Sequence, residues 1–491
     1  MSLRIYNTLT RQKEPFEPLA SGEVRMYVCG VTPYDVSHIG HARSALVFDV
    51  VARYLRYRGY RVTFVKNFTD VEDKIIARAG QLGIPTEELA ERYIAAYRRD
   101  MTALGVAPPD VEPKATAHIE PAPGKPFRMI SLIERLVAAG IAYVVDGDVY
   151  FEVGRFPAYG RLSGKNLEDL LAGARVEVDE RKRDPRDFAL WKAAKPGEPS
   201  WASPWGPGRP GWHIECSAMS MEYLGESFDI HGGGEDLVFP HHECEIAQSE
   251  AATGQPFARV WMHNGFVNLG AEKMSKSLGN ILTIEALLAR HDAEALRLYL
   301  LGTHYRHPVE FAEERVRETQ RALDRLRGLV DAHARVVAAD PEPAAEAALL
   351  EQIAPCEARF KAAMDDDFST PQALAVLFDL SRVLNAEYDL VLRGEHTGRA
   401  FGQGVASLFR LAGVLGLKRR GLSVSPRPSQ GDVEWTARIE ALVRERDEAR
   451  KRRDWEHADA LRDQIELAGA AVEDIPKAPS RWKPKPAPTA P

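Results

Sequence analysis

The chain is poor in cysteine and has no long apolar run. Its 491 residues include four cysteines, at positions 29, 216, 244 and 356, and none forms a Cys-x-x-Cys pair. Thiols scattered in this way give no disulfide framework, so we expect packing residues, reactive groups or metal ligands. No apolar stretch is long enough to span a membrane, and the start MSLRIYNTLTRQKEPF lacks a signal-peptide core. We therefore expect a cytoplasmic protein with no membrane partner.

The composition is that of a globular protein, with 45% hydrophobic and 27% charged residues. The length predicts roughly three or four domains. The 64 basic and 71 acidic residues give a net charge of -7. This balance neither indicates nor excludes a nucleic-acid partner, because it can hide a local basic face.

The first part of the chain has the pattern of a βαβ unit. Residues 24–30 form an apolar run that predicts a buried strand, and Ser37 is the expected N-cap of the helix that follows. Apolar residues at helical spacing continue to Arg58-Gly59, and RVTFVKN (61–67) predicts a second strand. Strand, helix, strand implies a parallel sheet with its ligand site at the carboxyl ends of the strands.

Later segments extend this pattern. Residues 227–250 predict a strand, a glycine turn and a helix, and ARVWMHNGFV predicts a further strand that ends at 267. The Pro-, Gly- and Trp-rich stretch 191–212 predicts an irregular surface loop. Beyond 280 the chain is predicted to be helical, with Thr370 as a cap and Pro371 at the first helical position.

We therefore expect an α/β protein with a Rossmann-like parallel-sheet domain split by an insertion, followed by an α-helical bundle and a small C-terminal domain. The expected boundaries are 1–120 and 206–267 for the two halves of the sheet domain, 121–205 for the insertion, 268–315 for a lysine-rich loop region, 316–421 for the bundle, 422–432 for a linker and 433–491 for the C-terminal domain with a flexible tail.

Two short motifs carry basic side chains suited to phosphate. His38 and His41 lie three residues apart at the expected helix start, where unpaired backbone N–H groups favour an anion. The alternative is that one histidine caps the helix and the other packs. Lys273 and Lys276 lie three apart in AEKMSKSLGN, where both ammonium groups can reach a polyphosphate. The alternative there is a solvated charged loop.

The sequence HIGH after the first strand, together with KMSKS after the last, resembles the class I aminoacyl-tRNA synthetases. The resemblance implies that His38, His41, Lys273 and Lys276 are catalytic and handle the phosphates of ATP bound with Mg2+. It also implies ATP contacts at Gly40, Gly232, Gly233 and Asp236.

Metal ligands are suggested by a second group of residues. His241 and Glu245 lie four apart on one helix face, and Cys29 and Cys216 can add two thiolates. A His and a Glu four apart on a helix are more often a surface pair, so spacing alone favours that alternative for His241 and Glu245.

Longer runs, among them NFTDVEDKIIARA, GWHIECSAMS and HGGGEDLVFPHHECEIAQSE, resemble the cysteinyl-tRNA synthetase family. The resemblance implies one zinc ion per subunit on Cys29, Cys216, His241 and Glu245, which also takes the thiolate of the substrate L-cysteine. It implies a cysteine pocket of Gly30, Thr32, Thr69 and Trp212, although Trp212 alone could be a core residue. The implied activity is formation of cysteinyl-adenylate and transfer of cysteine to tRNA(Cys).

The C-terminal part is expected to bind tRNA by resemblance, with the anticodon on residues 433–491 and the bundle spanning the tRNA. Its interleaved charges are also typical of a solvated helical hairpin. One motif departs from the family, because this chain has CGVTPYD where many members have CGPTVYD. Two alternatives therefore stay open: a ligase that joins cysteine to an amino sugar in mycothiol synthesis, and a non-catalytic RNA-binding paralogue.

Overall fold

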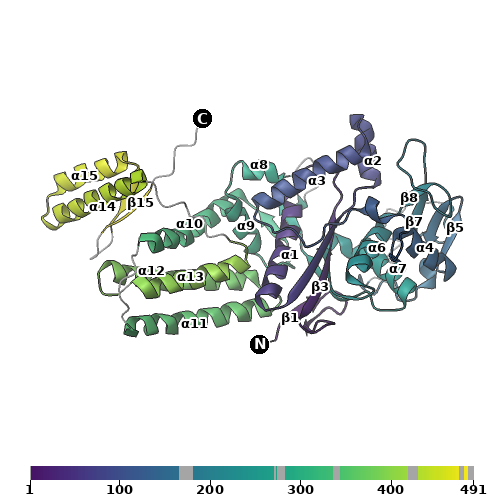
Figure 1. Cartoon of the computed structure of the whole chain (residues 1–491), viewed down its shortest axis with the longest axis horizontal. Coiled ribbons are helices and arrows are strands. Elements are labelled where there is room, and N and C mark those ends of the chain that lie inside the picture. The colour runs from purple at the N-terminus through teal and green to yellow at the C-terminus, as the bar shows by residue number, and fades with distance from the viewer. Residues whose placement is uncertain are drawn as a thin grey trace. The chain divides into compact units, whose positions relative to one another are not determined.

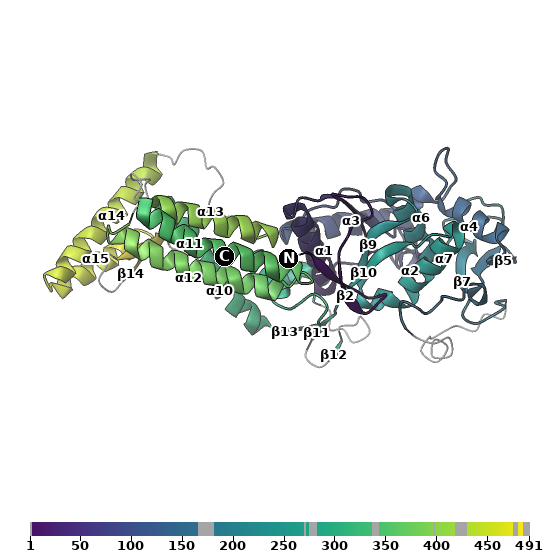
Figure 2. The ribbon, with the colours of Figure 1, turned by 90° about the horizontal axis from the view of Figure 1, so that it is seen from below.

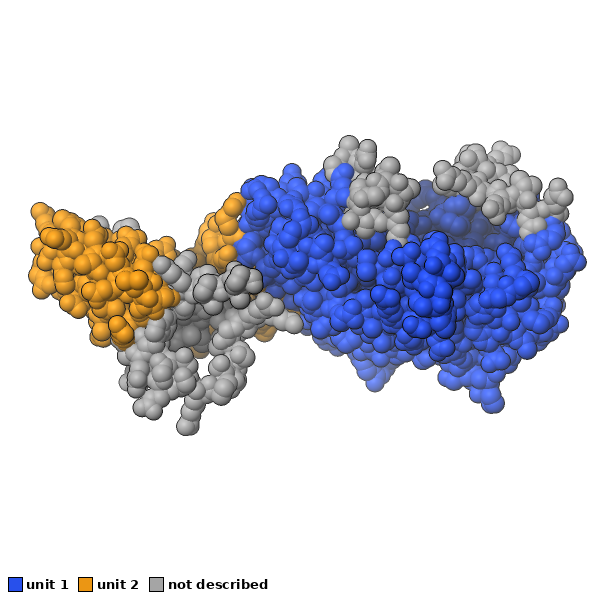
Figure 3. All heavy atoms as spheres, turned by 90° about the horizontal axis from the view of Figure 1, so that it is seen from above, with its two compact units in different colours: residues 1–320, 361–373, 414–416 blue, residues 321–360, 374–413, 417–491 orange. Residues whose placement is uncertain are grey.

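The computed structural model describes residues 2–164, 181–269, 272–273, 282–335, 343–396, 398–417, 430–474 and 480–484. The chain divides into two compact units, shown in blue and orange in Figure 3. Unit 1 contains residues 1–320, 361–373 and 414–416, and unit 2 contains residues 321–360, 374–413 and 417–491.

A parallel four-stranded sheet forms the centre of unit 1, as the sequence predicts. Its strands, in spatial order, are β10 (Ala258–Asn264), β9 (Phe228–Gly234), β3 (Glu23–Val31) and β4 (Arg61–Phe68). Helices α1 (Ile39–Tyr57) and α6 (Trp212–Leu224) lie on opposite sides of β3 (Figures 1 and 2). The sheet is therefore covered on both faces, and its strands are buried along most of their length.

The start of α1 differs from the prediction. Its N-cap is His38 and not Ser37, because the His38 ring accepts the Gly40 N–H while the Ser37 carbonyl accepts the Ile284 N–H at 3.0 Å. The helix ends where the sequence predicts, with Arg58 as C-cap and Gly59 at a φ of +91°. Glycine adopts this left-handed conformation without a Cβ clash.

The insertion forms an antiparallel sheet that the sequence did not predict. Residues 191–212 are not all irregular: Trp191 lies in β7 and pairs with Pro210 of β8, and α6 begins at Trp212. The fully buried Trp191 side chain anchors this strand in the core. The elements here are η1 (Ala115–His118), α4 (Met129–Ala138), β5 (Ala142–Val145), β6 (Asp148–Phe151), η2 (Val153–Arg155), β7 (Phe188–Ala193) and β8 (Gly208–Pro210).

The remaining elements of unit 1 surround the central sheet. β10 stops at Asn264, three residues before the predicted end, because Val267 already belongs to a small separate sheet, β12-β11-β13. These elements are β1 (Arg4–Asn7), β2 (Gln12–Pro15), α2 (Asp73–Leu82), α3 (Thr86–Ala103), η3 (Glu235–Leu237), η4 (Val238–His242), α7 (Glu243–Thr253), β11 (Val267–Leu269), β12 (Glu272–Lys273), α8 (Ile284–Leu288), α9 (Ala293–Leu301) and β13 (Val309–Phe311).

Four long helices follow, as predicted for the region beyond 280. They are α10 (Glu313–Arg335), α11 (Pro343–Asp365), α12 (Thr370–Leu392) and α13 (Gly398–Val414). α12 begins at Thr370 itself, so Thr370 does not precede the helix as expected, and its hydroxyl donates to the Leu301 carbonyl at 2.7 Å. Within unit 2, Gly404 approaches Leu384 and Ile353 so closely that a Cβ there would clash with Leu384.

The C-terminal residues form a small α/β module inside unit 2. It contains α14 (Gln430–Lys451), α15 (Trp455–Leu467), β14 (Ala470–Glu473) and β15 (Arg481–Pro484). α14 begins inside the predicted linker, and β15 lies in the predicted flexible tail, where Trp482 is buried beside Ile439 and Ile465. Burial of Trp482 therefore holds in place a strand that lies where the Pro-rich sequence predicts a flexible tail. Among the described residues, no helix is long and apolar enough to cross a membrane.

A buried ion pair fastens α1 to α9. The Arg297 guanidinium is fully buried, pairs with Asp49, and donates to the carbonyls of Leu415 at 2.7 Å and Gly105 at 3.1 Å. Asp49 is also paired with Arg53 at 2.9 Å. Breaking such a pair is costly because it leaves a buried carboxylate without its main partner.

Replacing Arg297 by methionine should therefore destabilise unit 1 by about 3 kcal/mol. Calorimetry on the full chain should show the transition of unit 1 moving down by roughly 5 °C or more. Arg317→Met is the matched control, because the Arg317 side chain is 58% exposed where it pairs with Glu314 and its ion pair should contribute little. Equal shifts in both variants would contradict this assignment.

Candidate active site

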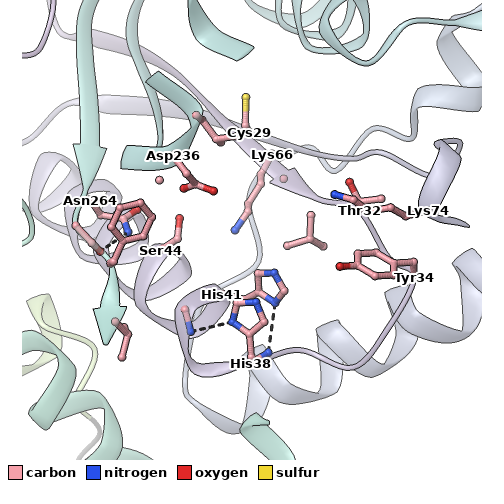
Figure 4. A pocket seen from close by; sticks show the side chains of 18 of the residues that line it. Cys29, Thr32, Tyr34, His38, His41, Ser44, Lys66, Lys74, Asp236 and Asn264 are labelled. Carbon is pink, nitrogen blue, oxygen red and sulfur yellow. Dashed lines mark hydrogen bonds between the residues drawn. The ribbon is translucent and has the colours of Figure 1, made fainter. Parts of the chain in front are cut away.

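A cavity of about 400 Å³ opens at the carboxyl ends of β3 and β4. A parallel sheet of this kind is expected to bind ligands at that edge. Figure 4 shows side chains that line the cavity, which is bounded by the first βαβ unit, by Lys74 of α2, by the start of α6 and by the ends of β9 and β10 with the residues that follow them. The lining includes eight residues that the sequence motifs indicated, namely Cys29, Gly30, Thr32, His38, Gly40, His41, Trp212 and Asp236.

His38 and His41 form a reciprocal cap at the start of α1. His38 Nδ1 accepts the Gly40 N–H at 3.1 Å, and His41 Nδ1 accepts the His38 N–H at 3.3 Å. The two rings stack with centroids 3.8 Å apart. A histidine therefore does cap the helix, yet both rings line the cavity.

This cap fixes the tautomer of both rings. A nitrogen that accepts a hydrogen bond carries no proton, so in each neutral ring the proton is on Nε2. Two Nε2–H donors and the N-terminus of a 19-residue helix then serve the same cavity. Such a group is suited to the oxygens of a phosphate.

The described residues on either side of the lysine motif lie beside the same cavity. Lys273 lies in β12 and pairs with Asn268 of β11, close to the cavity-lining Val267. On the other side, Thr283 forms a β-bridge with His38, and the Ile39 N–H donates to the Leu282 carbonyl at 3.0 Å. Lys276 and the side chain of Lys273 lie outside the described residues.

Cys29, Cys216, His241 and Glu245 come together in one buried cluster. Their ligand atoms all lie within 4.8 Å of one another. The two sulfur atoms are 3.6 Å apart, Cys29 Sγ is 3.3 Å from Glu245 Oε1, and His241 Nε2 is 3.0 Å from the same oxygen. Two thiolates bound to one zinc ion at about 2.3 Å in tetrahedral geometry stand roughly 3.7 Å apart. The donor types and their spacing therefore fit a zinc-sized ion.

A second donor set overlaps the first. It consists of Cys29, His231, His242 and Glu245. His231 Nε2 lies 2.8 Å from Glu245 Oε2, and His242 Nε2 lies 3.3 Å from Cys29 Sγ. The first set is the better zinc site because it has two thiolates, and because His241 is held from behind by His213, with 2.9 Å between the Nδ1 atoms.

The cluster is a network of opposite charges among buried side chains. Burial alone would raise the pKa of the Glu245 carboxyl, but His231 and His241 hold that pKa well below its usual range. Burial would lower the pKa of His241, yet Glu245 and Cys216 raise it to about 10. The Cys216 thiol is buried too, and its hydrogen bond with Cys29 together with nearby His241 lowers its pKa to about 6.

Cys29 behaves differently from Cys216. Burial, followed by the hydrogen bond to Cys216, raises the pKa of the Cys29 thiol. Cys244, next to Glu245 in the sequence, belongs to neither donor set, and its sulfur lies 3.3 Å from the Tyr159 hydroxyl.

The expected cysteine pocket is only partly lined as predicted. Gly30 and Thr32 line the cavity, whereas Thr69 is buried and accepts from the Asn67 side chain at 3.3 Å. A Cβ on Gly30 would lie 1.5 Å from the Asn67 carbonyl oxygen, so packing alone requires glycine there. Trp212 is not a core residue, because it is 38% exposed and stacks on His241 with centroids 4.2 Å apart.

The glycines assigned to the nucleotide lie within β9 and not after it. A Cβ on Gly232 would lie 2.3 Å from the Phe48 ring, and one on Gly233 would lie 2.8 Å from the His242 ring. Neither is among the residues that line the cavity, whereas Asp236 is.

Several site residues were missed by the sequence analysis. Asn67 Oδ1 accepts the Gly30 N–H at 2.8 Å and lies 3.7 Å from Cys216 Sγ. His213, His231 and His242 surround the cluster. The adjacent histidines of PHHEC were a visible signal for His242, but no spacing in the sequence links Asn67 to Cys216.

Comparison with known proteins agrees with this geometry. The family described as tRNA synthetases class I (C) catalytic domain matches residues 15–321, a DALR domain matches 359–419, and a cysteinyl-tRNA ligase anticodon binding domain matches 432–479. A cysteine–tRNA ligase of Alkalilimnicola ehrlichii is 54% identical over 98% of this chain and 99% of its own length. One of Geobacter sulfurreducens is 52% identical over 99% and 100%.

The chain belongs to the cysteine–tRNA ligase family of class I synthetases. Solved structures of other class I synthetases share the fold of this family member. A Mycobacterium tuberculosis methionyl-tRNA synthetase in complex with methionyl-adenylate has a TM-score of 0.58 at 18% identity, over 80% of this chain and 89% of that one. The expected fold class is thereby confirmed. The names of the curated relatives and the match to an anticodon-binding domain favour neither of the two alternatives, the amino-sugar ligase and the non-catalytic paralogue.

Proposed function

We propose that this protein activates L-cysteine with ATP to cysteinyl-adenylate and transfers the cysteine to the 3′ end of tRNA(Cys). The observation that carries the proposal is the position of Cys29, which belongs to the buried metal-ligand cluster and also lines the cavity that holds both HIGH histidines. A thiol-selecting site and a phosphate site are thus parts of one pocket. The more than 50% identical relatives named cysteine–tRNA ligase support the same activity.

Cys29, Cys216, His241 and Glu245 would hold zinc in this proposal. Zinc bound there would supply a soft Lewis acid that takes the substrate thiolate as a further ligand in preference to the hydroxyl of serine. Ordinary pocket contacts would discriminate between cysteine and serine by only about 1–3 kcal/mol, because the two side chains differ so little. The His213 ring behind His241 and the His231 ring on Glu245 keep these two ligands oriented.

The other assigned residues act on ATP and on the rest of the amino acid. His38 and His41 donate their Nε2–H groups to phosphate oxygens, and Lys273 and Lys276 add positive charge to ATP, which enters with Mg2+. Gly40 and Asp236, which line the cavity, would form the nucleotide site, and Gly30, Thr32 and Trp212 would form the cysteine pocket. Gly232, Gly233 and Thr69 do not line the cavity and are assigned to these sites by resemblance alone. Because little proton chemistry is needed, positioning and charge stabilisation supply most of the rate.

The second step requires tRNA, whose terminal ribose hydroxyl attacks the adenylate carbonyl and releases AMP. Residues 433–491 would bind the anticodon, and the anticodon-domain match to 432–479 supports this role. Residues 316–421 would span the tRNA. Residues 268–315 would contact the acceptor stem. Translation takes place in the cytoplasm, where we also expect this protein.

Cysteine-dependent ATP/pyrophosphate exchange tests the proposal, and absence of exchange with zinc and Mg2+ present would refute it.

The metal assignment is tested by Cys216→Ser. A hydroxyl is a poor replacement for a thiolate ligand, so zinc retained after dialysis should fall by roughly tenfold or more. Binding of cysteine should be lost while ATP still binds, which shows that the variant is folded. Cys244→Ser is the matched control, since Cys244 is equally buried but contacts Tyr159, and it should keep its zinc. Full zinc occupancy in Cys216→Ser would contradict the ligand set.

Zinc binding to the metal-free protein should weaken as the pH falls. Above its pKa of about 6, Cys216 is already a thiolate. Cys29, whose pKa is raised, and His241, whose pKa is about 10, must each lose a proton to become ligands. Two displaced protons mean an affinity change of about 100-fold per pH unit between pH 7 and 8. Competition against a chelator measures this slope, and an affinity that does not change with pH would show that both groups are already deprotonated.

His38→Asn separates the two roles of that histidine. The asparagine oxygen can still accept the Gly40 N–H and cap α1, but the Nε2–H donor is lost. We expect exchange activity to fall by about 100-fold with little change in melting temperature. His38→Ala should lose the cap as well, at a cost of about 1 kcal/mol in stability. Wild-type exchange in His38→Asn would mean that His38 only caps the helix.

A further inference from the structure

Lys66 is a buried lysine in the wall of the active-site cavity. It lies near the carboxyl end of β4, paired with Val28 of β3, and its residue exposure is 8%. Lys66 lines the cavity together with His41 and Ser44. In Figure 4 its amine is turned into the cavity, on the side where His41 lies. None of the motifs in the sequence pointed to this residue.

The hydrogen-bond partner of this ammonium group is neutral. Lys66 Nζ donates to the Tyr97 hydroxyl at 2.8 Å and lies 5.4 Å from the centroid of the Tyr97 ring. Within the part of the chain that the structure describes, no carboxylate forms an ion pair with Lys66. Lys74, another lysine that lines the cavity, is solvent-exposed and loses little hydration.

A buried cation without a counter-ion is costly. Because its amine faces the cavity, Lys66 keeps part of its hydration, but only 8% of the residue is exposed and a phenol hydroxyl replaces only part of the water that is lost. The cost is offset once an anion binds beside it. In this cavity, a ligand with anionic oxygens would supply the missing partner.

The reaction brings two anionic groups together at this place. The cysteine carboxylate forms a bond to the α-phosphorus of ATP while the bond from that phosphorus to the bridging oxygen breaks and its electron pair leaves with pyrophosphate. Cys29 places the amino-acid end of the cavity at the end of β3, and His41 places the phosphate end at α1. Lys66, on the neighbouring strand, faces the region between these ends.

We propose that Lys66 is a catalytic residue whose ammonium group binds the anionic oxygens where the cysteine carboxylate meets the α-phosphate. Its charge relieves the repulsion between the two reactants as they approach. This inference rests on the proposed function. It adds a cation on a rigid strand to those on the lysine loop, and a cation fixed in this way needs no loop movement to reach the reacting atoms.

Three variants test the proposal by ATP/pyrophosphate exchange. Lys66→Met should lower kcat by about 100-fold, Lys66→Arg should restore part of that loss, and Tyr97→Phe should stay within about threefold of wild type. Tyr97→Phe is the matched control, because it removes the partner of Lys66 but not its charge. Unchanged kcat in Lys66→Met would overturn the proposal, as would an equal loss in Tyr97→Phe, which would indicate a merely structural role.

Binding experiments identify which anionic group Lys66 meets. Calorimetry on wild type and Lys66→Met measures ATP binding in one titration. Separate titrations without ATP measure the binding of cysteine and of cysteamine, which has the thiol and amine but no carboxylate. Weakening of cysteine alone in Lys66→Met, by about tenfold or more, assigns the carboxylate. Weakening of ATP alone assigns the α-phosphate, and either result supports the proposal. Equal weakening of cysteine and cysteamine overturns it.

The wild-type protein distinguishes this inference from the proposed function. If wild type neither binds cysteine in a zinc-dependent way nor catalyses exchange, the proposed function fails. If wild type does both and Lys66→Met matches it, the inference about Lys66 alone fails.

Discussion

The site depends on one constraint: a charged ligand set must be held out of water without any member lacking a partner. Glu245 is fully buried, which would be prohibitive for an isolated carboxylate. It is tolerated because His231 and His241 lie within 3.0 Å of its oxygens. The parallel sheet makes this arrangement possible, since it brings β3, α6 and the segment after β9 together at one edge, although they are far apart in the sequence.

The same atoms serve the fold and the chemistry at the start of α1. Capping requires His38 Nδ1 to accept the Gly40 N–H, and this hydrogen bond also directs the ring proton to Nε2. Capping and phosphate binding, which look like alternatives in the sequence, are therefore compatible in one side chain. The β-bridge from His38 to Thr283 adds a third role, because it fastens the segment that follows the lysine motif to the helix.

The sequence predicted the parts of the fold that rest on local periodicity. The strands around Val28 and Val65 and the end of α1 at Arg58 were correct because burial pattern and glycine punctuation are local signals. The cap, the β7–β8 pairing and β15 depend on distant partners, which local patterns do not contain. The cluster itself followed from resemblance, since no contiguous spacing links Cys29 to Cys216. Asn67 and Lys66 were missed because a polar residue inside a strand looks like an interruption until its neighbours are known.

Trp212 links the metal-ligand cluster to the cavity. Its ring stacks on His241, a member of the cluster, while 38% of its surface stays exposed. A partly exposed aromatic side chain in a pocket wall is stabilised further when a ligand covers its exposed surface. A small thiol held near Cys29 would cover this ring, so binding at the cluster and closure of the pocket wall favour each other. Serine has a similar shape but would not gain the sulfur–metal interaction that starts this coupling, and selectivity would then arise at the first binding step.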